Sequence, residues 1–194
     1  SVSLNNMIYI GVNSNKRLLS SSSARRAISF ALNRSVILSK SYSNRGTATY
    51  LPINPLYDTG TNVKVPSYST KKAISLLEKL GYKSTNSSGI RTKNRKTFTL
   101  KLLINSDNNY KELIASAVKS ALQTVGIEVK IVRAKSMSAF TSKIKSGDFD
   151  LYIGETRLTN NMDISDFFSG SVLSKGISGK SKLSSAYKKY LKTS

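Results

Sequence analysis

Between residues 98 and 153 the apolar residues change their spacing several times, and this alternation restricts the fold more than any other feature. Apolar, β-prone runs occupy 98–104, 127–132 and 149–153. Between them, segments 113–125 and 137–147 repeat apolar residues at helical spacing, and each ends at a glycine. The order strand, helix, strand, helix, strand predicts a parallel sheet joined by right-handed crossovers. We therefore expect an α/β fold.

The remaining segments add elements to both ends of this unit. Residues 7–13 predict a strand, serines 20–23 offer caps to a helix carrying Ala27, Ile28, Ala31 and Leu32, and 36–38 predict a second short helix. All three prolines lie within 43–69, which predicts a long loop. A helix capped by Ser69 and ended by Gly81 follows, and then an exposed hairpin or loop at 84–96.

We expect one domain over residues 1–194, with a Ser- and Lys-rich tail at 170–194 that holds a short helix. The chain begins Ser1-Val2-Ser3 without an initiator Met, so we expect a mature form or an excised segment.

Two absences from the composition exclude most enzyme classes. The chain contains no Cys and no His, which excludes disulfides, thiolate nucleophiles, Ser-His-Asp and Cys-His catalysis, and zinc sites built on those ligands. It also contains no apolar run of about 18 residues, the length needed to cross a bilayer. We predict no catalytic residue, no metal ligand and no cofactor.

The chain has few carboxylates and half of them lie in one segment, which is the candidate for acid/base catalysis. Five of the ten are Asp148, Asp150, Glu155, Asp163 and Asp166. Two carboxylates across a cleft could cleave a glycoside. The simpler interpretation is that the first two flank a turn into a strand and the last two cap a short helix. We favour the structural interpretation, because the spacing shows no acid/base pair.

The charge of the chain is strongly positive, at +21 from 31 Lys and Arg against ten Asp and Glu. Basic residues such as Lys71, Lys101, Lys111 and Lys130 are scattered over polar positions of amphipathic segments, where solvated charge is expected. The dense runs at 91–96 and 175–192 carry no interleaved aromatic platform of the kind that binds single strands. Specific nucleic-acid recognition is therefore disfavoured. A basic module that binds nucleic acid or an anionic cell-wall polymer remains the alternative function.

The segment 154–163 follows the last predicted strand and is dense in hydrogen-bonding side chains without a nucleophile. The carboxyl ends of parallel strands open onto the ligand crevice of α/β folds. We therefore predict that this segment lines a binding cleft.

The order of motifs resembles the carboxyl-terminal lobe of the family 5 extracellular solute-binding proteins, the oligopeptide, dipeptide and nickel binders of ABC importers. The family's strand ending in Asn and its Arg-x-Ala-Ile-x-x-Ala-Ile-Asp-Arg helix are similar to 9–13 and 25–34. Its Gly-x-Ala loop, proline pair, Gly-Tyr helix, Gly-Ile-x-Val segment and Gly-Asp-Phe-Asp turn are similar to 46–48, 52–55, 73–82, 122–129 and 147–150.

This resemblance implies a periplasmic-binding-protein-like lobe with a mixed, mostly parallel sheet flanked by helices. It also implies binding of a small-molecule or peptide solute, a missing amino-terminal lobe that completes the cleft, and delivery to a membrane permease. The location would be extracytoplasmic, with a lipid anchor when full length. Peptide-binding members carry a Trp and then an Asp where this chain has Arg157 and Asn160. An amide cannot form the charge-assisted pair that anchors a peptide's ammonium group. The ligand-binding residues expected here are Asn13, Arg157, Asn160, Asn161 and Asp163.

Overall fold

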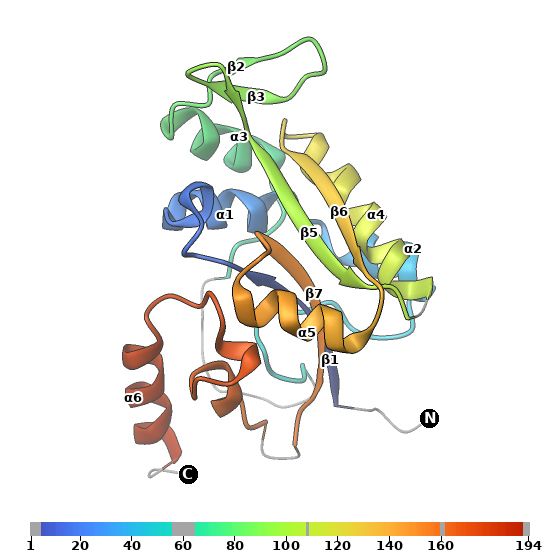
Figure 1. The fold of residues 1–194 in the computed structure, drawn as a ribbon, viewed down its shortest axis with the longest axis vertical. Helices are drawn as coiled ribbons and strands as arrows, with labels where there is room; N and C mark the ends of the chain where they lie inside the picture. The colour runs from blue at the N-terminus through green and yellow to red at the C-terminus, as the bar shows by residue number, and fades with distance from the viewer. Residues whose placement is uncertain (1–4, 56–64, 108, 160–161, 192–194) are drawn as a thin grey trace.

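A four-stranded sheet forms the centre of the computed structural model, which describes residues 5–55, 65–107, 109–159 and 162–191 (Figure 1). In chain order the elements are β1 (Asn6–Val12), η1 (Arg17–Leu19), α1 (Ser22–Ala31), α2 (Arg34–Tyr42), α3 (Thr70–Lys79), β2 (Ser84–Thr85), β3 (Arg91–Lys93), β4 (Lys96–Thr97), β5 (Thr99–Asn105), α4 (Asn109–Gln123), β6 (Glu128–Ala134), α5 (Met137–Ser146), β7 (Leu151–Arg157), η2 (Ser165–Phe167), η3 (Val172–Ser174) and α6 (Lys180–Leu191).

The strand order of the main sheet is β1-β7-β5-β6. Strand β5 pairs in parallel with both β6 and β7, whereas β1 pairs antiparallel to β7 from Asn6 opposite Arg157 to Val12 opposite Leu151. The predicted α/β fold with a mixed, mostly parallel sheet is confirmed.

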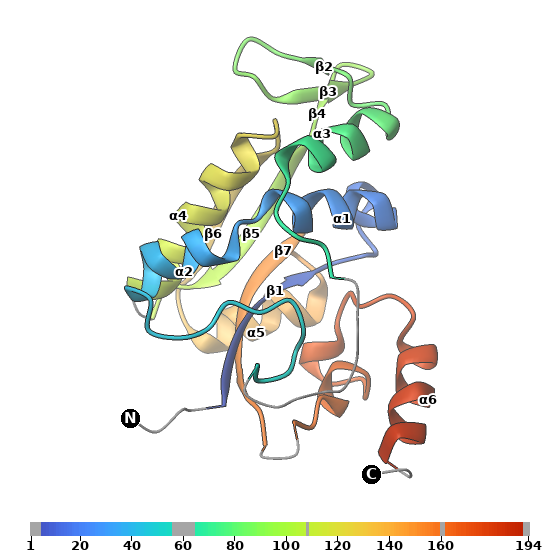
Figure 2. The ribbon, with the colours of Figure 1, turned by 180° about the vertical axis from the view of Figure 1, so that it is seen from behind.

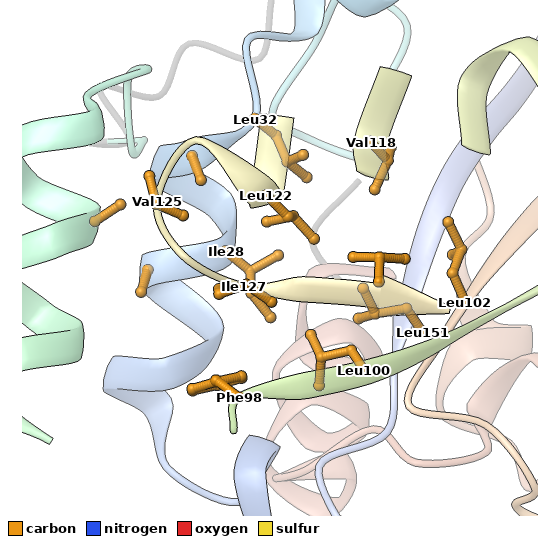
Figure 3. Packing of buried hydrophobic residues seen from close by; sticks show 14 of the residues in the cluster. Ile28, Leu32, Phe98, Leu100, Leu102, Val118, Leu122, Val125, Ile127 and Leu151 are labelled. Atoms are coloured by element: carbon orange, nitrogen blue, oxygen red, sulfur yellow. The ribbon is translucent and has the colours of Figure 1, made fainter. Parts of the chain in front are cut away.

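Helices cover both faces of this sheet, as the two opposite views show (Figures 1 and 2). On one face α1 and α4 pack their apolar stripes against the sheet, with Ile28 and Leu32 meeting Val118, Leu122 and the strand residues (Figure 3). On the other face, α5 and the segment before α6 surround Leu103, Phe149 and Tyr152.

Capping residues and glycines in the sequence mark most of the helix ends. Ser21, Asn33, Ser69 and Ser136 cap α1, α2, α3 and α5, each accepting a backbone N–H. Gly147 ends α5 with φ +74°, a left-handed value that favours glycine. The segment 84–97 forms a small three-stranded sheet in the order β2-β3-β4, which agrees with the hairpin rather than the loop of the two structures predicted for 84–96.

Among the element boundaries that differ from the sequence prediction, one bears on the predicted binding segment. Strand β7 does not end at Ile153 but continues to Arg157, so 154–157 are strand rather than loop. The physical reason is tertiary, because β1 offers an antiparallel partner along the whole of β7. Backbone pairing then outweighs the polar, glycine-containing composition of 154–157, which had placed the end of the strand at Ile153.

Candidate functional site

The carboxyl ends of the three parallel strands lie along one edge of the sheet, which we call the carboxyl edge. It comprises the ends of β5, β6 and β7 at Asn105, Ala134 and Arg157, together with the first turn of α4. Asn105 stands opposite Ala134 in the parallel register, and β7 runs in the same direction. In open α/β sheets, ligands bind outside this edge.

A buried lysine organises the carboxyl edge. The side chain of Lys111 is 7% exposed, and its Nζ lies 3.1 Å from Asp107 Oδ1 and 3.7 Å from Glu155 Oε2. Asn105 Nδ2 donates to the second oxygen of Asp107 at 3.0 Å. A buried ammonium is tolerated only where carboxylates pair with it. Taken alone, these two carboxylates and the ammonium carry one net negative charge, which the guanidinium of Arg157 at the end of β7 offsets.

Two tyrosines complete the group. The Tyr110 hydroxyl donates to Glu155 Oε2, and the rings of Tyr42 and Tyr110 lie 4.8 Å apart. Burial raises the pKa of the Tyr42 phenol, and the nearby Glu155 carboxylate acts in the same direction. The edge therefore offers hydroxyls, carboxylates and an aromatic surface. Within the described residues no group of three or more Asp, Glu, Cys or His side chains could hold a metal ion.

The sequence interpretation of Lys111 was wrong, and the other members of this group were missed as site residues. Lys111 was assigned to a solvated helix face, but the fold closes over it. The available signal was the polar pair Asn105 and Asp107 directly after an apolar strand. It was obscured because an Asp before a helix is usually a cap.

The predicted ligand residues lie in different places. Arg157 is the last residue of β7, exposed at the carboxyl edge. Asn160 and Asn161 lie outside the described residues. Asp163 is exposed, and its Oδ1 accepts from the Ser165 N–H and the Tyr187 hydroxyl, each at 2.8 Å. Both hydrogen bonds hold the pKa of Asp163 below its ordinary value, and the bond from the Ser165 backbone has the larger effect.

Asn13 lies at the opposite edge of the sheet, because antiparallel β1 ends where β7 begins. Its side chain is buried, donates to Gly147 O at 3.3 Å and Phe149 O at 3.1 Å, and accepts from Asn15 N at 3.2 Å. These contacts give Asn13 a structural role in the turn after β1. The structure does not bring it together with Arg157.

The acidic segment is likewise divided by the fold. Asp148 pairs with Lys143 at 2.7 Å and Lys101 at 3.3 Å, and Asp150 accepts from the Lys101 backbone N–H at 2.8 Å. Both carboxylates precede β7, whereas Glu155 lies near its far end, about 13 Å from the start of the strand at about 3.3 Å per residue. The arrangement supports the structural interpretation of Asp148 and Asp150 as residues that hold the turn into the strand.

The chain belongs to the bacterial extracellular solute-binding proteins of family 5, because the model of that family's middle region matches residues 1–179. The oligopeptide-binding protein AppA of Bacillus subtilis (strain 168) is 33% identical over 175 residues, which are 88% of this chain and 32% of that protein. The oligopeptide-binding protein OppA of Lactococcus lactis subsp. cremoris (strain SK11) is 26% identical over 171 residues, 84% of this chain and 28% of that protein. The chain thus spans about a third of the length of these relatives.

Solved structures agree with the fold. The structure of AppA from Bacillus subtilis in complex with a nonapeptide superposes with a TM-score of 0.78 at 27% identity, covering 96% of this chain and 42% of that one. NikA from Brucella suis, in complex with Fe(III)-EDTA, also gives 0.78, at 19% identity and with 94% and 39% covered, which supports the fold alone. The family is of the solute-binding, non-enzymatic type, and its members act outside the cytoplasm. None of the described helices has the length and apolar character to cross a membrane.

Proposed function

We propose that residues 1–194 form one lobe of an extracytoplasmic solute-binding protein of an ABC importer. The carboxyl edge of the sheet is the wall of this lobe that faces the ligand. One observation carries the proposal: in a member of a solute-binding family, the ends of the parallel strands meet a partly exposed polar group centred on Lys111. Family membership favours this function over the alternative of a basic module for nucleic acid or cell-wall polymer. The chain has no enzymatic role.

The ligand is a peptide-like solute. Relatives named as oligopeptide-binding proteins support this class. Arg157 contacts the ligand at the end of β7, together with Asn160, Asn161 and Asp163 in the segment that follows. Because Asn160 is neutral, this lobe does not supply the charged anchor for a peptide's free amino terminus at that position. Asn13 is not included, since its side chain is used within the turn after β1.

The partners follow from the same proposal. A second lobe, outside residues 1–194, supplies the other wall of the cleft, and hinge closure of the two lobes on the ligand creates the surface that a membrane permease recognises. A lipid anchor on the full-length protein holds it at the outer face of the membrane.

Calorimetric and NMR titrations of residues 1–194 with pooled tetra- to hexapeptides test this function. With one wall of the cleft present, we expect dissociation constants weaker than about 1 μM. Amide shifts should concentrate at Glu155, Arg157 and Lys111. Nanomolar affinity of this chain alone would contradict the one-lobe proposal, and shifts confined to the opposite edge near Asn13 would contradict the site.

A matched pair of variants tests the role of Arg157. Arg157→Gln should weaken the peptide-induced shifts at the carboxyl edge several-fold, because a charged hydrogen-bond donor is removed from the end of β7. Arg95→Gln removes the same charge from the exposed turn between β3 and β4 and should leave the titration unchanged. Equal effects of the two variants would show that peptide binding depends on the net charge of the chain and not on the position of Arg157.

A further inference from the structure

Helix α3 and the small sheet β2-β3-β4 form the end of the molecule opposite the carboxyl edge (Figures 1 and 2). Strand β4 leads into the start of β5, whereas the carboxyl edge lies at the other end of that strand. The length of β5 separates the two by roughly 20 Å at about 3.3 Å per residue. A partner bound at one end therefore leaves the other end free.

This end of the molecule carries almost no negative charge. Residues 69–96 contain eight Lys and Arg and one carboxylate, a net +7 that is one third of the charge of the chain, whereas 97–159 contain nine and six. The one carboxylate, Glu78, is paired with the buried Arg91 at 3.4 Å. The other basic side chains are exposed and, with exposed Arg26 of α1, form what we call the basic end: Lys71, Lys72, Lys79, Lys83, Lys93, Arg95 and Lys96. None of them forms an ion pair within the described residues.

Contacts within the fold hold several of these cations close together. The Arg26 guanidinium and the Lys72 ammonium lie 5.8 and 5.6 Å from the centre of the Phe30 ring. An aromatic face attracts a cation, but two like charges at one ring repel each other, and a nearby anion relieves that repulsion. Lys93 Nζ donates to the Leu80 carbonyl at 2.8 Å, which ties the small sheet to the end of α3. The fold thus gathers positive charge at this end.

The turn between β3 and β4 carries a cation where glycine is preferred. Lys93 pairs with Lys96, so Asn94 and Arg95 form a two-residue turn with φ of +51° and +62°. Glycine is favoured at the second position of such a turn, because an L side chain is strained in the left-handed region. Arg95 instead places a guanidinium at the tip of the small sheet.

An exposed tyrosine and valine adjoin the basic end. Tyr68 is 47% and Val65 is 37% exposed, directly before α3. Ser69 N donates to Phe30 O at 2.8 Å, which holds this segment next to the residue whose ring the two cations approach. Tyrosine is favoured at a bilayer interface, since its ring enters the headgroup region while its hydroxyl stays in water. Exposed cations beside such side chains favour contact with a membrane surface.

The arrangement fits a surface that carries many negative charges. The cations lie on two helices and on a small sheet that projects from the molecule, so they are spread over this end and do not converge on one point (Figure 1). Single-stranded nucleic acid is bound by successive aromatic rings, whereas Tyr68 is the one exposed ring among residues 65–96. A bilayer with anionic lipids attracts Lys and Arg side chains within a Debye length of its surface.

We infer that the basic end docks on the surface of a bilayer that contains anionic phospholipids. Its Lys and Arg side chains contact the lipid phosphates, and Tyr68 enters the headgroup region. Because members of the family act outside the cytoplasm, the surface concerned is the outer one. A lobe docked in this way keeps its carboxyl edge away from the bilayer and open to solute. The inference does not depend on which solute the carboxyl edge binds.

Tryptophan fluorescence tests the position of the contact, because the chain contains no Trp of its own. Tyr68→Trp places a reporter at the basic end, and Leu113→Trp places one on α4, where the native side chain is 48% exposed. With vesicles of equimolar phosphatidylglycerol and phosphatidylcholine, we expect the emission of Tyr68→Trp to shift to the blue by at least about 10 nm and that of Leu113→Trp to stay unchanged. Neither should shift with phosphatidylcholine alone.

Two results of this experiment would overturn the inference. The first is an unchanged Tyr68→Trp emission with the anionic vesicles. The second is an equal blue shift with soluble polyphosphate, which would show that the basic end binds a soluble polyanion and needs no bilayer.

Two double variants with the same change of charge separate docking by this end from general attraction by the net charge. Lys83→Gln with Arg95→Gln should weaken cosedimentation with the anionic vesicles at least about fivefold, whereas Lys119→Gln with Lys145→Gln, on exposed positions of α4 and α5, should weaken it less than about twofold. Equal losses would overturn the inference. Neither double variant should alter the peptide titration at the carboxyl edge, so failure of this inference and failure of the proposed function give different results.

Discussion

Gly176 shows how one residue joins the tail to the sheet. Its φ is +80°, and a Cβ added there would lie 2.8 Å from the Asn13 Cα. Its carbonyl accepts both the Ser14 N–H at 2.8 Å and the Ser14 hydroxyl at 2.6 Å. Backbone conformation and close approach both require glycine at this position. The sequence signal was only one glycine among several in a Ser- and Lys-rich tail.

We expect Gly176→Ala to destabilise the protein by about 1–3 kcal/mol, because the methyl group forces the tail away from β1 and breaks the Ser14 bonds. Urea unfolding followed by circular dichroism measures the loss. Gly179→Ala is the control, since Gly179 also has a positive φ, +70°, but no atom lies within 4 Å of an added Cβ. A cost for Gly176→Ala no larger than for the control would contradict the close-approach argument.

At the scale of elements, a buried arginine joins the small sheet to the helical layer. Arg91 begins β3, and its Nε donates to Val125 O at 2.9 Å while Nη1 donates to Tyr82 O at 2.8 Å. Nη1 also reaches Glu78 at 3.4 Å. Arg91 had been counted with the exposed basic run at 91–96, yet its side chain is 10% exposed. Composition alone could not reveal this, because the carbonyls it satisfies come from distant helix ends.

We expect Arg91→Met to cost about 2–4 kcal/mol, since two buried carbonyls lose their donors and Glu78 loses its partner. Thermal and urea unfolding measure this change. Lys96→Met removes a basic side chain from exposed β4 and should shift stability by about 0.5 kcal/mol or less. Similar values for the two variants would show that the Arg91 contacts contribute little.

The attachment of α6 should depend on pH through Asp163. Its folded pKa is lowered, so its contribution to stability is complete above the unfolded pKa near 4 and is lost as the pH falls through the lower folded value. The stability difference between wild type and Asp163→Asn should therefore shrink as the pH falls from about 5 through the lowered folded pKa. Limited proteolysis of α6 over the same range provides a second measurement. Asp166→Asn is the control, since that side chain forms no hydrogen bond within the described residues, and a parallel decline for both variants would contradict the assignment.

At the scale of the whole molecule, the net charge of +21 opposes folding of this chain on its own. Five of the described carboxylates form ion pairs, such as Glu112 with Arg133 at 2.8 Å, and these are far fewer than the basic side chains of the chain. Self-repulsion of this kind is screened by salt over a Debye length of about 10 Å at 0.1 M.

We expect the melting temperature of residues 1–194 to rise by about 2–6 °C between 10 and 200 mM NaCl, because added salt screens the repulsion between the positive side chains. Differential scanning calorimetry measures it. KCl at the same ionic strength should act equally, which separates screening from ion-specific effects. An unchanged or lower melting temperature would show that the positive charges are already compensated by their arrangement in the fold.

The sequence by itself determined the elements and the class of fold. Apolar period, serine and asparagine caps and terminal glycines act within a few residues of the chain, and α1, α3, α4 and α5 begin and end close to where these signals place them. The family motifs, read along the chain, led to the same fold and family.

Only the tertiary structure decided which residues share a site. Antiparallel pairing of β1 sends Asn13 to the edge opposite Arg157 and extends β7 beyond Ile153. Lys111 and Arg91, which the sequence analysis placed on the surface, are buried and organise the residues around them. The position of β1 at one end of the described strand order likewise depends on these long-range pairings. In each case the deciding contact joins residues far apart in the chain, and a local pattern carries no information about such a partner.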